Sequence, residues 1–267
     1  MISFPNAKIN LGLNILNKRD DGYHNIESCL YPIPFTDVLE ILPSEQFSFT
    51  NTGLTVDHDR GDNLCIKAYE LIKAEYKISP VNMHLHKAIP MGAGLGGGSA
   101  DAAFTLKMLD EIFELKIGNE KLKALASKLG SDCPFFIDNK PALATGTGTD
   151  LELIPVDLKG KYMVLIFPEF SIGTSEAYAN VHPAQPEHSL KEVITLPLIE
   201  WKDQVKNDFE PSIFPNHEVL QQIKDNLIKQ GSIYAAMSGS GSTMFGVFDK
   251  ESEISQFETY KSKGFYI

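Results

Sequence analysis

The sequence has few basic residues for its length. Lysine and arginine number 24 against 35 aspartates and glutamates, which gives a formal net charge of −11 at pH 7. A nucleic-acid backbone or an anionic membrane surface requires a basic face, so neither is expected as a partner. An anionic small molecule remains compatible with this charge if local cations and backbone N–H groups receive it.

Long apolar runs and cysteines are also scarce. No apolar run reaches the roughly 18 residues of a membrane-spanning helix, and polar residues such as Lys8 and Asn14 interrupt the opening segment. We therefore expect neither a membrane span nor a signal peptide. Cys29, Cys65 and Cys133 are odd in number, far apart and in no metal-binding spacing. They predict free thiols in a reducing cytoplasm.

The composition that remains is that of an ordinary globular protein. Hydrophobic residues make up 43% and charged residues 22% of 267 positions, enough to bury a core. Strand-like and helix-like segments occur in both halves, which predicts an α+β fold. The length favours two domains. The amino-acid composition changes after Asp150, which indicates a domain boundary. We expect domains at residues 1–155 and 156–267.

The first half alternates predicted strands and helices. "AKINLGLNIL" alternates as a strand, "RDDGYH" predicts a turn, and "DVLEIL" and "FSFTNTG" predict short strands. "DNLCIKAYELIKAEY" predicts a helix capped near Asp62. "VNMHLHKAIP" alternates as a half-exposed antiparallel strand does. A helix capped by Ser99 follows, and "NEKLKALASKLGSD" predicts another that stops at Gly130.

The second half carries fewer but clear signals. "KYMVLIFP" is a short continuous apolar strand, and "PEFSIGTSEAYANVHP" is a polar loop that enters a helix. "HEVLQQIKDNLIKQG" predicts a helix that ends at Gly231. "MSGSGSTMFGVF" is a small-residue loop that leads into a strand.

The stretch "PMGAGLGGGSA", residues 90–100, predicts close approach of the backbone to a phosphate. Gly92, Gly94 and Gly97 formally fit G-x-G-x-x-G, but the strand before them alternates, unlike a buried Rossmann strand. No Gly-Lys-Ser/Thr follows, and the protein-kinase signatures H-R-D and D-F-G are absent. An anion nest before a helix N-terminus remains. The alternative is a glycine turn that only connects strand and helix.

A carboxylate and a cation supply the second part of a candidate site. "LGSDCPFF" places Asp132 between a helix end and two phenylalanines, where a partly desolvated carboxylate suits a general base or a group that orients a hydroxyl. Lys8 on the polar face of the first strand could neutralise charge on a transferred phosphoryl group. Taken singly, each is better explained by an ordinary surface salt bridge.

Together these stretches resemble a known family. "PNAKINLGL", "PMGAGLGGGSA" and "MSGSGSTMFG" occur in the order of the three motifs of the GHMP kinase superfamily. "RDDGYH", "LGSDCPFF" and "FSIGTSEAY" resemble, more narrowly, a branch that acts on a cytidine-diphosphate-linked sugar alcohol in the non-mevalonate isoprenoid pathway. The resemblance spans Pro5 to Gly246. It implies a ribosomal S5 domain 2-like N-terminal domain and a ferredoxin-like C-terminal domain.

The resemblance also implies the reaction and its cofactors. The branch transfers the γ-phosphoryl group of ATP, with Mg²⁺, to a hydroxyl of the sugar alcohol. Asp132 matches the catalytic aspartate and Lys8 its partner, and whether Asp132 removes the proton or only orients the hydroxyl stays open. Asn63 and Lys87 match the adenine side of the pocket, and Ser99 lies near the phosphates or the metal. The residues implied to wrap the triphosphate are Pro90, Gly92, Ala93, Gly94, Leu95, Gly96, Gly97, Gly98, Ser99 and Ala100.

Substrate contacts are implied in both halves. Tyr23 and His24 match the pair that receives cytosine, and Thr174 and Tyr178 would close the other side of that pocket. Asn10 matches a polar contact to the acceptor. The third motif adds two residues expected to face the substrate phosphates, Gly239 and Ser240. Tyr178 stands where a Phe is usual, and it should stack equally well.

Other functions stay open at this stage. A kinase for homoserine, mevalonate or a sugar, a non-catalytic nucleotide-binding protein, and a nicotinamide oxidoreductase are the alternatives. His84 and His86 share one strand face and could ligate a metal, although a solvated face explains them better. We expect a monomer or a weak homodimer.

Overall fold

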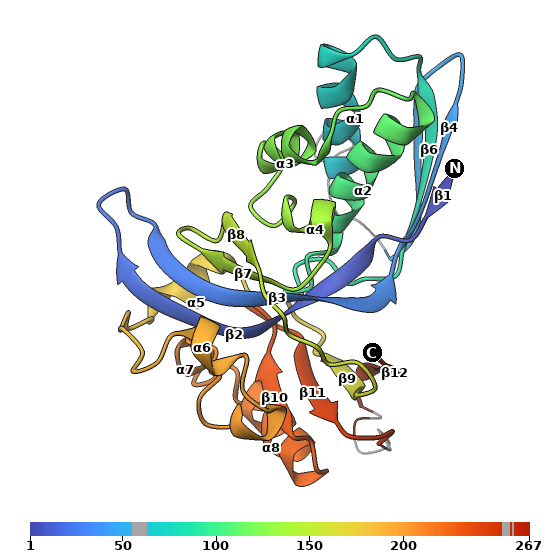
Figure 1. Cartoon of the computed structure of the whole chain (residues 1–267). Coiled ribbons are helices and arrows are strands. Elements are labelled where there is room, and N and C mark those ends of the chain that lie inside the picture. The colour runs from blue at the N-terminus through green and yellow to red at the C-terminus, as the bar shows by residue number, and fades with distance from the viewer. Residues whose placement is uncertain (55–62, 253–256, 258) are drawn as a thin grey trace. The chain divides into compact units, whose positions relative to one another are not determined.

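The computed structural model of the chain divides into two compact units (Figure 1). It describes residues 1–54, 63–252, 257 and 259–267. Unit 1 comprises Met1–Lys8, Pro34–Met91 and Gly96–Lys140. Unit 2 comprises Ile9–Ile33, Gly92–Leu95 and Pro141–Ile267. The chain therefore passes repeatedly between the units, and the glycine-rich stretch contributes to both.

The expected boundary at residues 155–156 differs from this division. Strands β2 (Asn6–Lys18) and β3 (His24–Thr36) form one sheet with β7 (Ala142–Thr145) and β8 (Asp150–Leu153), in the order β2-β3-β7-β8. Most of this sheet lies in unit 2, so early strands group with the later half of the chain. No local composition signal marks such long-range pairing.

Unit 1 is a four-stranded sheet covered on one face by helices (Figure 1). Its order is β1-β4-β6-β5, with β1 at Ile2–Ser3, β4 at Val38–Pro43, β6 at Val81–Lys87 and β5 at Ser48–Gly53. The helices are α1 (Leu64–Glu75), α2 (Gly97–Ile112), α3 (Asn119–Ser127) and the short α4 (Phe135–Asp138). These elements confirm the strands and helices that periodicity predicts.

Strand β6 leads into the glycine-rich stretch, and its alternation is confirmed. Every second residue from Val81 to Lys87 is buried, and Asn82, His84 and His86 are exposed. β6 pairs antiparallel with β4, as expected, but parallel with β5. The parallel pair was not predicted; it arises because α1 crosses over between β5 and β6.

The starts of α1 and α2 differ from the expected caps. Asn63 caps α1, because its side chain accepts a hydrogen bond from the N–H of Cys65 at 2.9 Å, and Asp62 lies outside the described residues. Helix α2 begins at Gly97, so Ser99 belongs to its first turn and is not the cap. Gly96 takes the cap position with φ 68°, a left-handed conformation that favours glycine.

The second sheet of unit 2 has the order β10-β11-β9-β12, and all its pairs are antiparallel. The strands are β9 (Tyr162–Phe167), β10 (Tyr234–Met237), β11 (Met244–Phe248) and β12 (Lys261–Tyr266). The helical elements of the unit are α5 (Thr174–Ala179), α6 (Leu190–Val193), the 3-10 helix η2 (Leu198–Glu200), α7 (Glu210–Ile213) and α8 (Glu218–Lys229).

The hydrophobic core of this region forms where α8 packs on β10 and β11 (Figure 1). Leu220, Ile223 and Leu227 on one face of α8 are buried with Val164 of β9 and Met244 of β11. Full burial of such a side chain stabilises the fold by roughly 1.5–3 kcal/mol. Among the described residues, no helix is both long and apolar enough to cross a membrane.

Candidate active site

The N-terminus of α2 offers backbone donors for an anion. α2 is 16 residues long, and no side chain caps its first turn. The first N–H groups of a helix have no acceptor within the helix, and the helix dipole gives this end a partial positive charge. Gly96, Gly97, Gly98 and Ser99 stand at this end. The donor set fits the phosphates that the sequence predicts here.

Lys8 and Asp132 meet beside this helix end. Lys8 Nζ lies 3.4 Å from Asp132 Oδ2, and the side chains are 5% and 38% exposed. A Cβ added to Gly96 would lie 3.1 Å from Lys8 Cγ, so the lysine stem packs against the residue that caps α2. The structure thus brings both predicted catalytic residues to the N-terminal end of α2, with the carboxylate still accessible.

Cys133 follows Asp132 but is unsuited to nucleophilic chemistry. Its thiol is buried, and burial raises its pKa to about 11 although a hydrogen bond with Ser99 opposes the shift. A thiol with this pKa stays protonated near neutral pH, and only the thiolate is a strong nucleophile. The packed free cysteine expected from the sequence is consistent with this placement.

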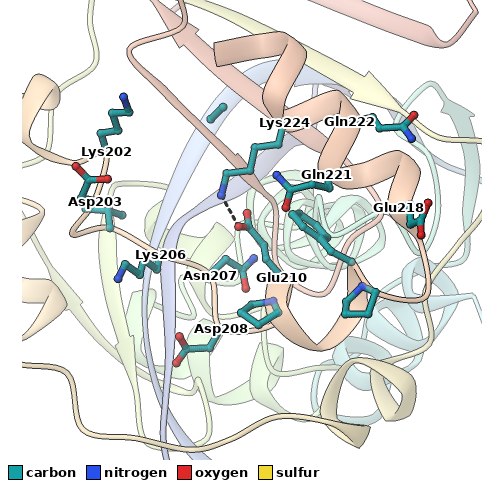
Figure 2. A pocket seen from close by; sticks show the side chains of 15 residues that line it. Lys202, Asp203, Lys206, Asn207, Asp208, Glu210, Glu218, Gln221, Gln222 and Lys224 are labelled. Carbon is teal, nitrogen blue, oxygen red and sulfur yellow. Dashed lines mark hydrogen bonds and ion pairs between the residues drawn. The ribbon is translucent and has the colours of Figure 1, made fainter. Parts of the chain in front are cut away.

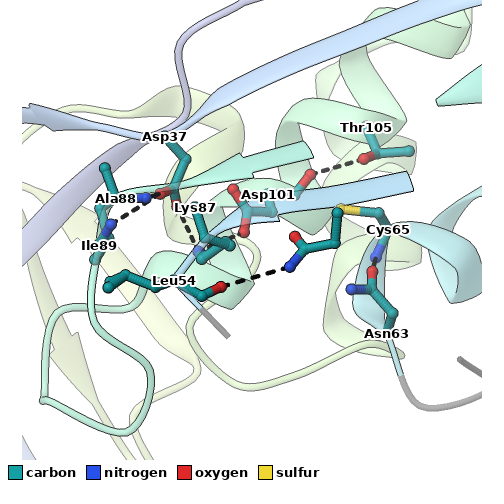
Figure 3. Close-up of polar contacts among 10 residues, drawn as sticks. Asp37, Leu54, Asn63, Cys65, Lys87, Ala88, Ile89, Asp101 and Thr105 are labelled. Carbon is teal, nitrogen blue, oxygen red and sulfur yellow. Dashed lines mark hydrogen bonds and ion pairs between the residues drawn. The ribbon is translucent and has the colours of Figure 1, made fainter. Parts of the chain in front are cut away.

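Lys87 takes a different position from the one expected. It lies on the buried face of β6, 1% exposed, and forms ion pairs with Asp37 and with Asp101 at 2.8 Å (Figure 3). Asp37 also accepts hydrogen bonds from the N–H groups of Ala88 and Ile89, at 2.6 and 2.9 Å. The ammonium therefore does not line an open adenine surface. A lone buried cation is costly, so it is neutralised inside the protein.

This Lys87–Asp37–Asp101 triad holds two carboxylates for one ammonium. Burial raises the pKa of Asp101 to about 7, with Lys87 opposing and Asp37 reinforcing the shift. Burial lowers the pKa of Lys87, but the attraction of both carboxylates raises it by more, so it stays above its usual value. Asp101 Oδ1 is buried and has no hydrogen-bond partner among the described residues. With both carboxylates ionised, the triad would carry more negative charge than its lysine balances.

In unit 2, the other part of the glycine-rich stretch packs on the third motif. The Ser238 hydroxyl donates to the Gly94 carbonyl at 2.9 Å and accepts from the Asn10 N–H at 3.3 Å. A Cβ on Gly94, where φ is +78°, would lie 1.9 Å from the Ser238 carbonyl oxygen, so only glycine fits. A Cβ on Gly239 would lie 3.2 Å from Asn10 Oδ1. Residues of all three motifs therefore meet here.

Asn10 is less open than an acceptor contact would suggest. It is buried, and its side-chain amide donates to the Ser28 hydroxyl at 2.8 Å. Ala93, in the second motif, accepts from the Thr243 N–H at 3.3 Å. Both residues therefore help to tie the motifs together within unit 2.

The residues expected at cytosine are only partly assembled. His24 and Tyr178 stack with ring centroids 4.8 Å apart and an interplanar angle of 20°. A base between them would need roughly twice the ~3.5 Å of a stacking contact, so it would have to use an outer face or part the rings. Thr174 is exposed at the start of α5. Tyr23 is 68% exposed, and no ring contact joins it to another described residue.

Metal ligands are sparse in the part of the chain that the structure describes. There, no group of three or more His, Cys, Asp and Glu residues is placed to hold a metal ion. His84 and His86 lie on the exposed face of β6 and both bond to the Thr52 hydroxyl, at 2.9 and 3.0 Å. Mg²⁺ usually binds through substrate phosphates and one or two protein groups. A site with few protein ligands is therefore compatible with an Mg²⁺ ion that binds together with the phosphates.

Sequence reasoning missed a buried polar segment in unit 2. Asn207 and Glu210 line a pocket of about 790 Å³ (Figure 2), and neither residue was predicted from the motifs. Glu210 forms an ion pair with Lys224, and burial raises its pKa although Lys224 opposes the shift. The only signal was the run Asn207–Glu210, in which polar residues surround Phe209.

Family models match both halves of the chain. Residues 63–140 match the model described as the GHMP kinases N terminal domain, and residues 189–264 match the GHMP kinases C terminal model. The first segment contains helix α2 and Asp132, and the second contains the third motif.

Relatives with assigned names match over nearly the full length. The chain is 54% identical to 4-diphosphocytidyl-2-C-methyl-D-erythritol kinase of Parabacteroides distasonis, over 96% of this chain and 94% of that protein. It is 49% identical to the same kinase of Bacteroides thetaiotaomicron, over 95% and 94%.

Comparison with solved structures leads to the same kinase family. A crystal structure of 4-(cytidine 5'-diphospho)-2C-methyl-D-erythritol kinase superposes with a TM-score of 0.81 at 30% identity, covering 92% of this chain and 90% of that one. The mevalonate kinase of Methanococcus jannaschii, at 12% identity and a TM-score of 0.69 over 99% and 96%, shares the fold alone. The α+β fold is thus that of the GHMP kinases, and the chain belongs to the 4-diphosphocytidyl-2-C-methyl-D-erythritol kinase family.

Proposed function

We propose that this chain uses ATP and Mg²⁺ to phosphorylate the 2-hydroxyl of 4-diphosphocytidyl-2-C-methyl-D-erythritol, giving the 2-phosphate and ADP. The observation that carries the proposal is the Lys8–Asp132 pair, 3.4 Å apart, beside the uncapped N-terminus of α2. Membership of the kinase family supports the substrate. Three buried free cysteines are compatible with a cytoplasmic enzyme.

The start of α2 is proposed to receive the triphosphate. Backbone N–H groups from Gly96 to Ser99 point their partial positive charge at the phosphates, where a side chain would obstruct close approach. Bound with the phosphates, Mg²⁺ neutralises charge that builds up during transfer. The Ser99 hydroxyl stands in the first turn, where it can donate to a phosphate oxygen or meet the ion.

Lys8 and Asp132 are proposed to act on the acceptor hydroxyl. Asp132 is open enough to accept a hydrogen bond from the 2-hydroxyl and to direct its oxygen at the γ-phosphorus. Lys8, 3.4 Å from this carboxylate, stabilises the charge on the phosphoryl group during transfer. Phosphoryl transfer requires mainly positioning and charge stabilisation from a protein, so this short list of groups suffices.

Unit 2 is proposed to recognise the cytidine. The stacked His24 and Tyr178 present aromatic faces to a base, and the imidazole can read the base edge by hydrogen bonding. Tyr23 is exposed enough to close over a bound base. Gly239 and Ser240 face the diphosphate in this proposal.

A coupled assay of ADP release tests the proposed function directly. The purified chain is given ATP, Mg²⁺ and either the cytidyl substrate, mevalonate, homoserine or no acceptor. We expect ADP release to depend on the cytidyl substrate. Turnover of mevalonate or homoserine in preference would reassign the substrate, and no acceptor-dependent ADP would refute a kinase.

A further inference from the structure

The segment from Lys206 to Glu210 is fixed to strand β2. The Leu13 N–H donates to the Lys206 carbonyl, and the Asp208 N–H donates to the Leu13 carbonyl, each at 2.8 Å. The Asp208 carboxylate accepts from the Ile15 N–H at 2.7 Å. The segment is therefore held like an extra strand on the edge of β2.

Two side chains reach from this segment to the end of β10. The Asn207 amide donates to the carbonyls of Met237 and Gly239, both at 2.8 Å. Its oxygen accepts from the Phe209 N–H at 3.0 Å, so both donors and the acceptor of Asn207 are engaged. Glu210 accepts from the Met237 N–H at 2.8 Å, and Lys224 pairs with Glu210 (Figure 2).

The loop that these side chains hold has little conformational preference of its own. Gly239 and Gly241 both have positive φ values, 57° and 88°. Glycine populates many conformations, so such a loop keeps one of them only when outside contacts fix it. Asn207 supplies two of those contacts from a side chain that is 2% exposed.

We propose that Asn207 is a positioning residue of the kinase: by holding the carbonyls of Met237 and Gly239, it fixes the Gly239–Ser240 backbone that faces the acceptor substrate. This inference rests on the proposed function. Ser238 has its own bonds to Gly94 and to the Thr243 carbonyl, so the phosphate loop is held independently of Asn207. Asn207 therefore acts on the acceptor more than on ATP.

A purely structural role for Asn207 predicts a different outcome. β10 is the edge strand of its sheet, and a side chain that pairs its outer backbone groups stabilises the edge. In that case, removal of Asn207 would lower stability, and a folded variant would turn over normally. The two roles are separated by comparing kinetics with stability.

The test uses Asn207→Ala and, as a matched control, Tyr31→Phe. The Tyr31 hydroxyl is also in unit 2 and accepts from a backbone N–H, that of Leu158 at 3.1 Å, a bond that involves no motif residue. For Asn207→Ala we expect kcat/KM for the cytidyl substrate to fall at least 30-fold, while the Kd of an ATP analogue changes less than threefold. Tyr31→Phe should lose stability and keep kcat/KM within twofold.

A kcat/KM within twofold of the unmodified chain, for Asn207→Ala that is folded at the assay temperature, overturns the inference. If Asn207→Ala does not fold, Asn207→Ser decides, because its hydroxyl can donate to only one of the two carbonyls. At least a fivefold loss for the serine variant supports the inference, and a loss under twofold overturns it. If the unmodified chain itself shows no turnover of the cytidyl substrate, the proposed function fails first.

Discussion

Unit 1 contains two lysine–carboxylate assemblies that differ in exposure and in charge balance. Lys8 pairs with Asp132, whose side chain is 38% exposed. Lys87 is shared by Asp37 and Asp101, and all three side chains are almost fully buried. The open pair can meet a substrate, whereas the closed triad can act only on the protein around it.

The triad connects the elements at both ends of the glycine-rich stretch. Asp37 holds the backbone of Ala88 and Ile89 where β6 ends, and Asp101 belongs to α2 where the stretch ends. Lys87 joins the two carboxylates. A lysine just before a glycine-rich stretch is thus not by itself part of an adenine pocket, and burial decides between the two roles.

The largest expected effect is on the open pair. Asp132→Asn and Lys8→Met should each lower kcat by about 10²–10⁴-fold, the range that a positioned acid–base group contributes. The Kd of an ATP analogue, measured by calorimetry, should change little because the N–H groups of α2 remain. Near-normal kcat in both variants would show that the chemistry lies elsewhere.

The triad should respond in stability instead. Lys87→Met leaves two buried carboxylates without their cation and should cost about 3–5 kcal/mol of unfolding free energy, measured by urea denaturation. Lys123→Met is the control, because Lys123 pairs with Asp138 at 2.7 Å nearer the surface. That variant should lose less than about 1 kcal/mol. Equal losses in the two variants would remove the distinction between buried and open pairs.

Sequence periodicity predicted several elements, because alternation and helical spacing are local signals, but it did not predict β3, β7 or β12. The strands β2, β6 and β9 and the helices α1, α2 and α8 were predicted at nearly their observed bounds. The family motifs also indicated Lys8 and Asp132, which the structure brings together. The prediction placed the N-cap of α2 at Ser99. It was wrong because the helix begins within a run of glycines, Gly96 to Gly98, which is not a typical signal of a helix start.

Contacts between distant residues escaped prediction. The partners of Lys87 lie 50 and 14 positions away, and nothing near Lys87 shows that its ammonium faces inward onto them. Asn207 reaches groups 30 and 32 positions away. The mixed division of the chain into units has the same origin, since β3 pairs with β7, a strand more than a hundred residues later.

An intermediate effect is expected where an accessible aromatic face meets the base. Tyr178→Ala should raise KM for the cytidyl substrate by about 5–100-fold, since stacking on a base contributes roughly 1–3 kcal/mol. Tyr178→Phe keeps the ring and should change KM less than twofold. Equal KM values for the alanine and phenylalanine variants would place cytosine away from the His24–Tyr178 stack.

The smallest effect concerns the excess charge in the triad. The pKa of Asp101 is raised to about 7, so the folded chain binds a proton there more tightly than the unfolded chain. Stability should therefore fall as pH rises from about 4 to about 7. Asp101→Asn removes this slope and should be more stable by about 1–2 kcal/mol at pH 8, with a smaller gain at pH 5. Parallel pH profiles of unfolding would contradict the charge imbalance.

The contrast between the two assemblies is tested most directly by kcat for two matched variants. Asp132→Asn and Asp101→Asn each convert a lysine-bound aspartate to the corresponding amide. Both residues belong to unit 1, and both variants are measured in the same assay of ADP release. We predict a loss of more than a hundredfold for Asp132→Asn and less than threefold for Asp101→Asn. Equal losses, or a larger loss for Asp101→Asn, would contradict it.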